Sequence, residues 1–182
     1  MTLTVGDEKF SQKLNVLKDP HSSGTESDIQ AQTQLVASLR DEMNAIAASV
    51  NQIESIRAQL AALEKEIGSD EAGKAIRKAA DELADKLTNT EGKVLQLKAT
   101  GRGQDDVRWA PMLIQKIGYL ADEVGSSSDF PPTTQQVAVA DQLKQQGDQF
   151  QQEYQQILAK DVASFNAMLR EKNIPNIISK TQ

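Results

Sequence analysis

Apolar residues recur at steps of three and four between Glu26 and Ile67. The series consists of Val36, Leu39, Met43, Ile46, Val50, Ile53, Ile56, Leu60, Leu63 and Ile67. These steps place the side chains on one stripe of an α-helix, whereas a strand would show strict alternation. A helix of this length would be about 60 Å long, at about 1.5 Å per residue. Because so long a stripe must be covered by other helices, the pattern predicts a helical bundle.

The phase of this stripe changes once, near its middle. Two successive three-residue steps join Val50, Ile53 and Ile56, a pattern known from coiled coils as a stammer. We expect the helix either to overwind locally at this point or to exchange one packing partner for another.

Three further helices are predicted after Gly68. The first covers residues 69–99 and is expected to kink at Gly92, because its apolar stripe stays in phase across that residue. The second is a short helix over residues 109–124, and the third covers residues 133–173. The inward-facing positions are Ile76, Ala80, Leu83, Leu87, Val94 and Leu97, then Leu113, Ile117, Leu120 and Val124, then Val137, Ala140, Leu143, Gly147, Phe150, Tyr154, Leu158, Val162, Phe165 and Leu169.

Local signals support the ends of these helices. The capping-box spacings are Thr25 with Asp28 or Ser27 with Gln30, and Thr133 with Gln136. Pro175 cannot continue the last helix, yet the tail stays apolar. We therefore expect Ile174, Ile177 and Ile178 to fold back onto the end of the bundle.

Residues 2–17 are the one segment with strand character. The run TLTV, the pair Gly6-Asp7 and a second apolar run predict a hairpin whose turn begins with glycine, of type II′ or I′. Two strands alone are only marginally stable in water, so the hairpin either lies on the bundle or is the edge of a β-domain that this chain does not contain. Met1 leads directly into the first strand, which favours a piece cut from a longer protein. The candidate partner interface is then formed by Leu3, Val5, Phe10, Leu14 and Val16.

The elements combine into a mainly α fold. We predict a four-helix up-and-down bundle with two long and two shorter helices, preceded by a short N-terminal β-hairpin. Residues 1–20 form the hairpin, the remnant of a preceding β-domain, and residues 21–182 form the bundle. The chain of 182 residues is long enough to bury a core of its own.

The composition excludes several classes of function. Aromatic residues make up 4% of the chain, so an aromatic-lined ligand pocket is not expected. With a net charge of −6 and with its lysines and arginines interspersed among acids, the chain is not expected to bind nucleic acid or an anionic membrane. No apolar run approaches the roughly 20 residues of a membrane span. The absence of cysteine excludes disulfides, thiolate metal sites and cysteine nucleophiles.

The remaining reactive residues form no recognisable site. The single histidine, His21, lies in a Pro/Ser-rich connection, and the Glu-x-x-His pairs of di-iron helical bundles are absent. The loop serines, Ser22, Ser23 and Ser126 to Ser128, do not support a hydrolase triad, and one Gly101-Arg102-Gly103 run is too short for a phosphate loop. We therefore expect no catalytic residue, no cofactor or cofactor-binding residue, and no metal ligand.

Three runs of the sequence resemble a known family. The hairpin ends in KLNVLKDP, the long helix begins with SDIQAQ, and the last helix lies within DFPPTTQQ…LAKDVASFNAMLREKNIP. Together they resemble the C-terminal module of bacterial sortilin-like β-propeller proteins, often described as BNR-repeat glycosyl hydrolases, in which a strand ending in Asp-Pro-Arg leads from a β-domain into a helical bundle. His21 stands where that pattern has Arg.

The resemblance implies a location and a partner but no chemistry. Any glycosidase-like site would belong to the propeller, which this chain lacks, so no catalytic residue is carried over. The implied partner is the remainder of a parent protein that is exported to the periplasm or the cell surface. The resemblance also favours the interpretation that the hairpin is the edge of a β-domain that this chain does not contain. Copies of the chain could associate through this edge as a homo-oligomer.

Three hypotheses for function follow from these patterns. The first is a non-catalytic accessory or interaction module of a larger secreted β-propeller protein. The second is a free-standing helical adaptor or oligomerisation domain that binds a partner helix, which would leave an apolar strip exposed on the long helices. The third is a small-molecule sensor with a pocket near Trp109 and Tyr154, which a closed core at that place would contradict.

Overall fold

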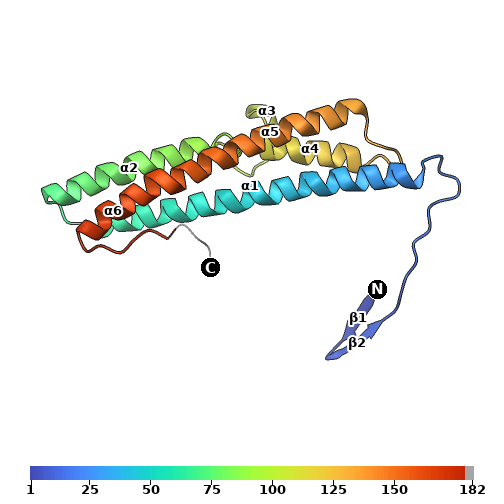
Figure 1. The fold of residues 1–182 in the computed structure, drawn as a ribbon, viewed down its shortest axis with the longest axis horizontal. Helices are drawn as coiled ribbons and strands as arrows, with labels where there is room; N and C mark the ends of the chain where they lie inside the picture. The colour runs from blue at the N-terminus through green and yellow to red at the C-terminus, as the bar shows by residue number, and fades with distance from the viewer. Residues whose placement is uncertain (179–182) are drawn as a thin grey trace.

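The computed structural model describes residues 1–178, with Asp106 described by its backbone alone, and it is a helical bundle with a detached hairpin (Figure 1). The helices are α1 (Glu26–Glu66), α2 (Glu71–Glu91), α3 (Asp105–Arg108), α4 (Leu113–Gly125), α5 (Thr134–Gln156), the π-helical segment η1 (Ile157–Val162) and α6 (Ala163–Glu171). This arrangement confirms the mainly α up-and-down bundle with two long and two shorter helices.

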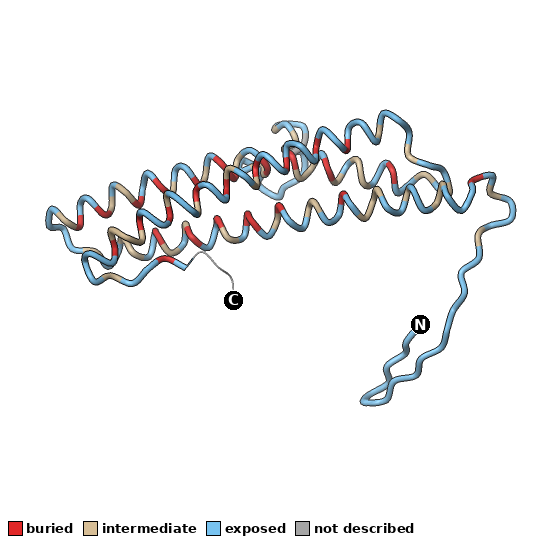
Figure 2. The backbone as a smooth tube through the Cα atoms, in the orientation of Figure 1, coloured by how far each residue is buried: buried red, intermediate tan, exposed pale blue. Residues whose placement is uncertain are grey.

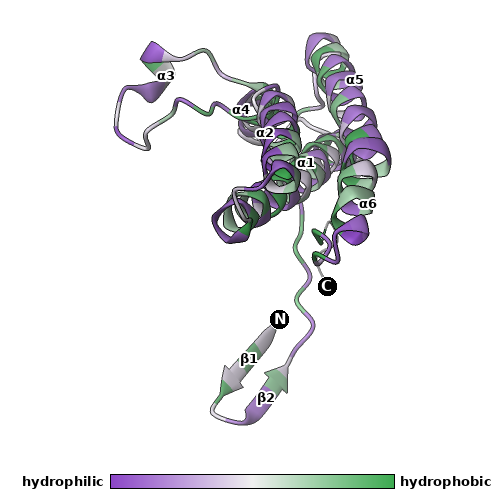
Figure 3. Ribbon diagram, turned by 90° about the vertical axis from the view of Figure 1, so that its left-hand side faces the viewer, coloured by the Kyte–Doolittle hydropathy of each residue, from purple (hydrophilic) through white to green (hydrophobic). Residues whose placement is uncertain are grey.

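The helices form three rods that lie side by side. α1 runs the length of the bundle, α2 and α4 follow one another along it, and α5, η1 and α6 return as one long helix (Figures 1 and 3). Buried residues lie on the faces that the three rods turn towards one another (Figure 2). The fully buried large side chains include Ile46, Ile53, Ile56, Leu60, Ile76, Leu87, Ile117, Tyr154, Ile157 and Leu169.

The phase change in α1 coincides with an exchange of packing partners. α2 ends at Glu91, and its carboxylate meets Arg57 of α1 at 2.5 Å. Residues of α1 before this point face α4, and those after it face α2. α1 is α-helical throughout. At the stammer its apolar stripe changes from packing on one helix to packing on the other, which is the second of the two outcomes expected from the sequence.

Polar side chains cap the N-termini of α1 and α5, as the capping-box spacings predict. The Thr25 N–H donates to the Asp28 carboxylate at 2.8 Å, and the Asp28 N–H donates back to the Thr25 hydroxyl at 3.2 Å. At the start of α5, Thr133 and Gln136 exchange the same pair of bonds, at 2.9 and 3.1 Å. The capping-box predictions are confirmed, and of the two spacings at the start of α1 the structure uses the first.

At Gly92 the structure has a break in the helix, where the sequence favoured a kink over a break. α2 ends at Glu91, and Gly92 is its C-cap. The Val94 carbonyl accepts a hydrogen bond from the Ile114 N–H at 3.1 Å, so the backbone pairs with the start of α4 and leaves its own helical ladder. Val94 stays buried, whereas Leu97, which the helical phase placed inward, is exposed.

Two other details of the rods differ from the sequence-based expectation. α4 begins at Leu113, four residues after Trp109, and the connection before it contains the short helix α3, which periodicity did not predict. Val137 at the start of α5 is exposed, although its place in the helical series predicted an inward position.

The long return helix contains a π-helical turn that periodicity missed. Regular steps place Leu158 in the core, but the structure buries Ile157 and leaves Leu158 half-buried. Ile157 and Val162 are five residues apart, and a π-turn, with its wider i to i+5 bonding, keeps both on the inner face. The core position is therefore Ile157, and the prediction for Leu158 is corrected.

The N-terminal hairpin consists of β1 (Thr2–Val5) and β2 (Glu8–Ser11), paired antiparallel with Leu3 opposite Phe10. Gly6 has a φ of 60°, and Asp7 is not among the residues with positive φ, which selects type II′ of the two predicted turns. Within residues 1–178, the strands pack on each other and on none of the helices. The hairpin lies away from the bundle (Figure 1).

Candidate functional site

The residues predicted to form a partner interface are all exposed. Leu3, Val5 and Phe10 lie on one face of the hairpin, because alternate residues of a strand share a face and Leu3 pairs with Phe10. Their exposed fractions are 61%, 59% and 56%. Leu14 and Val16 follow in the extended segment between the hairpin and the bundle, and they are exposed as well.

A short turn anchors this extended segment to the bundle. The Lys18 ammonium donates to the Ser22 carbonyl at 2.6 Å, and the His21 N–H donates to the Asp19 carboxylate at 2.8 Å. Gly24 then packs so closely on the backbone of Asp129, in the loop between α4 and α5, that a side chain at this position would overlap it. The turn directs residues 1–18 away from the helices (Figures 1 and 3).

A groove opens between α1 and α5 in the half of the bundle that contains α4. It has a volume of about 370 Å³. Its apolar lining consists of Leu35, Leu39, Ile117, Ala140 and Leu143. Asp41, Glu42 and Asp141 bring three carboxylates to it, against one ammonium, that of Lys144. The site combines an apolar floor with a predominantly acidic rim.

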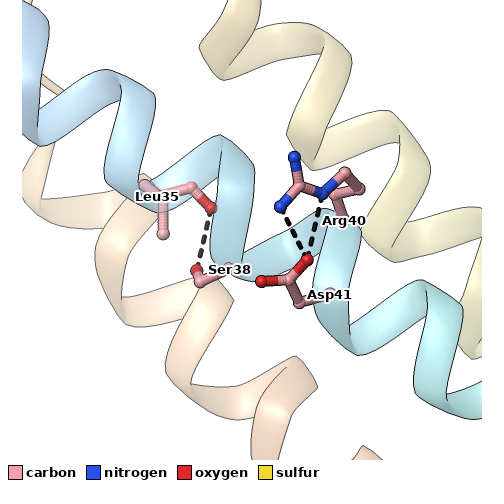
Figure 4. Close-up of polar contacts among 4 residues, drawn as sticks. All are labelled: Leu35, Ser38, Arg40 and Asp41. Atoms are coloured by element: carbon pink, nitrogen blue, oxygen red, sulfur yellow. Dashed lines mark hydrogen bonds and ion pairs between the residues drawn. The ribbon is translucent and has the colours of Figure 1, made fainter.

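The α1 wall of this groove satisfies its polar groups within the helix (Figure 4). The Ser38 hydroxyl donates to the Leu35 carbonyl at 2.8 Å, and the Arg40 guanidinium donates two bonds to one oxygen of Asp41, at 2.8 and 3.0 Å. Because the Ser38 hydroxyl already donates to a carbonyl of its own helix, a molecule in the groove does not need to accept a hydrogen bond from it.

Glu42 is one of the acidic residues that line the groove. Its carboxyl group packs against Gly147 of α5, in space that any side chain at position 147 would need. Burial raises the pKa of Glu42, and the charge of Asp148 raises it further, while the nearby Lys144 ammonium lowers it. Glu42 therefore gives the groove a carboxylate that is already partly removed from water.

Farther along, direct polar contacts close the seam between α1 and α5. The Gln151 amide accepts from the Ser49 hydroxyl at 3.0 Å and donates to the Ala45 carbonyl at 3.2 Å. One turn on, the Tyr154 hydroxyl donates to the Gln52 side chain at 3.0 Å. Each contact satisfies a polar group that close packing of the two helices removes from water.

The titration of Tyr154 gives a test of this closed seam. Burial raises the pKa of Tyr154 to about 12, from an ordinary 10.0. In a Tyr119→Phe variant, in which Tyr154 is the remaining tyrosine, tyrosinate absorbance should rise with a midpoint near 12. Because the folded pKa is the higher one, the stabilising effect of Tyr154 is complete below pH 10 and is lost as the pH approaches 12. A midpoint near 10 in the folded protein would contradict the buried position.

At the far end, the C-terminal tail closes the same seam. The Asn166 amide exchanges two hydrogen bonds with the backbone of Ile177, at 2.7 and 3.1 Å, and the Gln59 amide exchanges two with that of Ile178, at 2.8 and 3.0 Å. Ile177 is buried, Ile174 is half-buried and Ile178 is exposed. The expected return of the tail onto the bundle is thus confirmed for the first two of these residues.

A cluster of charges lies where α2 ends, and one of its members, Glu91, is buried. Glu91 is 1% exposed and pairs with Arg57, whose side chain reaches the surface. Beside it, Glu153 accepts hydrogen bonds from the Thr90 hydroxyl at 3.0 Å and from the Lys93 ammonium at 2.6 Å. Burial raises the pKa of Glu91 although Arg57 lowers it, whereas the Lys93 bond lowers the pKa of Glu153. The cluster joins α1, α2 and α5 at the level where α1 changes partners.

The two residues proposed to line a sensor pocket do not form one. Tyr154 is completely buried, with its ring stacked on Phe150 at a centroid distance of 6.4 Å. Trp109 lies in the connection before α4, where the Lys98 ammonium sits 5.0 Å from the centre of its ring. The closed core at Tyr154 contradicts the sensor hypothesis.

Periodicity and composition identified the exposed hairpin but not the groove between α1 and α5. Within residues 1–178, the carboxylates and His21 do not gather in groups of three or more that could hold a metal ion. None of the helices in this range is both long and apolar enough to cross a membrane. The chain matches no family model, no curated protein and no solved structure.

Proposed function

We propose that this chain is a non-catalytic helical interaction module that docks on a β-domain through its N-terminal hairpin. The observation that supports the proposal is the apolar face formed by Leu3, Val5 and Phe10, which no helix of the bundle covers. An isolated two-stranded sheet is marginally stable in water, and its apolar face gains free energy when another surface removes it from solvent.

The chemistry of the hairpin favours a β-domain as the partner. Both outer edges of the two-stranded sheet carry unpaired N–H and C=O groups, which a strand of another sheet can pair with. Adding strands to an existing sheet is a common mode of recognition, in which backbone bonds give affinity and alternate side chains give specificity. A hairpin with one apolar face is suited to this mode.

The resemblance to the C-terminal modules of sortilin-like β-propeller proteins supports the identity of the partner. In this proposal the β-domain belongs to a larger, exported protein, and the bundle is its helical accessory module. The extended residues 12–20 would then be the connection between the two parts.

The proposal predicts that the bundle does not need the hairpin. At a concentration at which both chains are monomeric, a chain that begins at Asp19 should melt at the same temperature as the full chain, because residues 1–18 add nothing to the buried core. In the full chain, Leu3→Ser with Phe10→Ser should remove hairpin-mediated self-association, measured by light scattering. Thr2→Ser with Thr4→Ser, on the opposite face, is the matched control and should leave it unchanged.

Two results would overturn the proposal. A melting temperature lowered by several degrees in the shortened chain would make the hairpin part of the bundle. The self-association of the apolar-face variant and of the control is compared in chains that also carry Leu14→Ser and Leu17→Ser, so that no contact through residues 13–18 contributes. Equal self-association under these conditions would remove the hairpin face as an interaction surface.

The second candidate is an oligomerisation domain that uses the helices themselves. One observation bears on it, namely the groove between α1 and α5. Of the apolar residues that line it, Leu35 is half-buried and Leu39, Ile117, Ala140 and Leu143 are at most 7% exposed, so the groove offers a small part of the exposed strip that this hypothesis requires.

A further inference from the structure

Two apolar features remain after the hairpin face has been assigned. One is the groove between α1 and α5, with its apolar floor and acidic rim. The other is the extended segment of residues 13–18, which we call the arm. Three of its side chains, those of Leu14, Val16 and Leu17, are exposed large hydrophobics.

The structure shows what kind of segment closes the seam to which the groove belongs. At the other end of the bundle the seam holds the extended tail, with Ile177 buried and Gln59 bonded to the tail backbone. Ser38 in the groove wall lies three heptads before Gln59 on α1. Ala45 and Gln52 occupy the same heptad position between them. All four residues lie on the side of α1 that faces the long helix formed by α5, η1 and α6. The groove is therefore the open stretch of a seam that an extended aliphatic segment fills elsewhere.

The arm has the chemistry that fits the groove. Lys13 precedes its three aliphatic residues, whereas the Lys18 ammonium that follows them bonds to the Ser22 carbonyl in the turn. The backbone of the arm is neither helical nor paired in a sheet. Glu42 and Asp141 bring carboxylates to the groove, whereas the third carboxylate, that of Asp41, pairs with Arg40, and the Lys144 ammonium pairs with Asp148. Opposite charges at the rim guide association and fix its register, while the apolar side chains supply burial.

The anchoring turn decides which groove the arm can use. Gly24 is fixed against Asp129, and the Lys18 and His21 bonds hold the turn that follows the arm. The arm consequently leaves the bundle instead of lying along its own α1 (Figure 3). A groove on a second copy is reached without breaking these contacts.

We propose that the arm of one copy occupies the α1–α5 groove of a second copy, in a reciprocal exchange that forms a symmetric dimer. A two-fold arrangement uses each arm and each groove once, so no further copies are recruited. The proposal does not rest on docking to a β-domain, because the hairpin face of Leu3, Val5 and Phe10 stays free while the arm is bound.

The absence of native cysteine makes a disulfide test clean. Val16→Cys and Ser38→Cys are prepared as separate full-length variants, mixed, and oxidised. A linked pair of the two chains should form at least about tenfold faster than the pair of Val16→Cys with Ala75→Cys, because docking raises the effective concentration of the first two thiols. Ala75 is the control because it is exposed on α2, outside the lining of the groove.

A second measurement keeps the proposal falsifiable if oxidation disturbs the fold. Leu14→Ser with Leu17→Ser should raise the dissociation constant of the full-length dimer about tenfold or more, measured by sedimentation. The melting temperature should be unchanged at concentrations at which the parent and the variant are both monomeric. Leu3→Ser with Phe10→Ser is the comparison variant, because it changes the hairpin face and leaves the arm intact. Its dissociation constant separates the contribution of the arm from that of the hairpin face.

Three outcomes would overturn the exchange. The first is a Val16–Ser38 linkage no faster than the control. The second is an intramolecular disulfide in the dilute Val16→Cys/Ser38→Cys double variant, which would place the arm in its own groove. The third is a dimer that is unaffected by the loss of Leu14 and Leu17.

Discussion

Ile157→Ala should lower the free energy of unfolding by about 3 kcal/mol, whereas Leu158→Ala should cost only about 1 kcal/mol. Ile157 is 1% exposed and Leu158 is half-buried, so truncating the first leaves a cavity that the surrounding core cannot fill. Urea denaturation of both variants, followed by circular dichroism, measures the difference.

This pair tests the π-helical turn directly. A regular α-helix through η1 would place Leu158 on the inner stripe with Tyr154 and Val162, and the order of the two effects would then be reversed. Ile178→Ala is a suitable control, because it removes the same atoms from an exposed isoleucine and should cost less than about 0.5 kcal/mol. An equal loss in the two core variants would contradict the register that the structure assigns.

Periodicity could predict most of the bundle because one rule governs most of its residues. Steps of three and four place a side chain over its neighbours one turn away, and this holds along α1 and along α2 as far as Glu91. The rule fails after Ile157, because the next buried position on this face, Val162, is five residues further on and the segment between them is π-helical. A single sequence offers Leu158 as an equally apolar choice, so the register could not be decided without the packing of α2 and α6.

The end of α2 shows a different limit of the sequence. The apolar phase continues through Val94 to Leu97, and a glycine alone costs only about 1 kcal/mol within a helix. Just beyond the end of the helix the backbone makes a long-range contact, the hydrogen bond from the Ile114 N–H to the Val94 carbonyl. Local propensity contains no information about that partner.

The two interaction surfaces differ in the same way. Leu3, Val5 and Phe10 could be recognised from the sequence, because alternation along two short strands is a local pattern. The groove depends on how far α5 diverges from α1 near Leu35 and Ala140, which is a property of three packed helices. The residues that line it look like ordinary core positions in the sequence, and Leu39 and Leu143 were indeed predicted as such.

Arg57→Met should lower the free energy of unfolding by about 3 kcal/mol at neutral pH. The Glu91 carboxylate is 1% exposed, and Arg57 is its ion-pair partner at 2.5 Å. Methionine keeps the aliphatic part of the side chain but removes the guanidinium, so a charge stays buried without its counter-charge. Urea denaturation as a function of pH measures the loss.

The loss should disappear in acid, and its sign follows from the pKa of Glu91. Burial already raises this pKa above its ordinary 4.5, and removal of the Arg57 charge raises it further. An acid whose folded pKa is raised costs nothing below its unfolded pKa, where both states are protonated, and its full cost appears once the pH exceeds the folded value. The difference between Arg57→Met and the parent should therefore be small near pH 4.5 and grow towards neutral pH.

Arg40→Met is the matched control, because Arg40 also lies on α1 and pairs with an acid, Asp41, but both of these side chains are 66% exposed. It should cost less than about 1 kcal/mol at every pH. The double variant Arg57→Met/Glu91→Gln should recover most of the loss, since the neutral amide has no charge to bury. If Arg57→Met matched Arg40→Met at neutral pH, or if its effect did not diminish in acid, the Glu91 carboxylate would not be buried as the structure places it. The recovery in the double variant separates the loss of a counter-charge from the loss of packing, because packing at position 57 is the same in both.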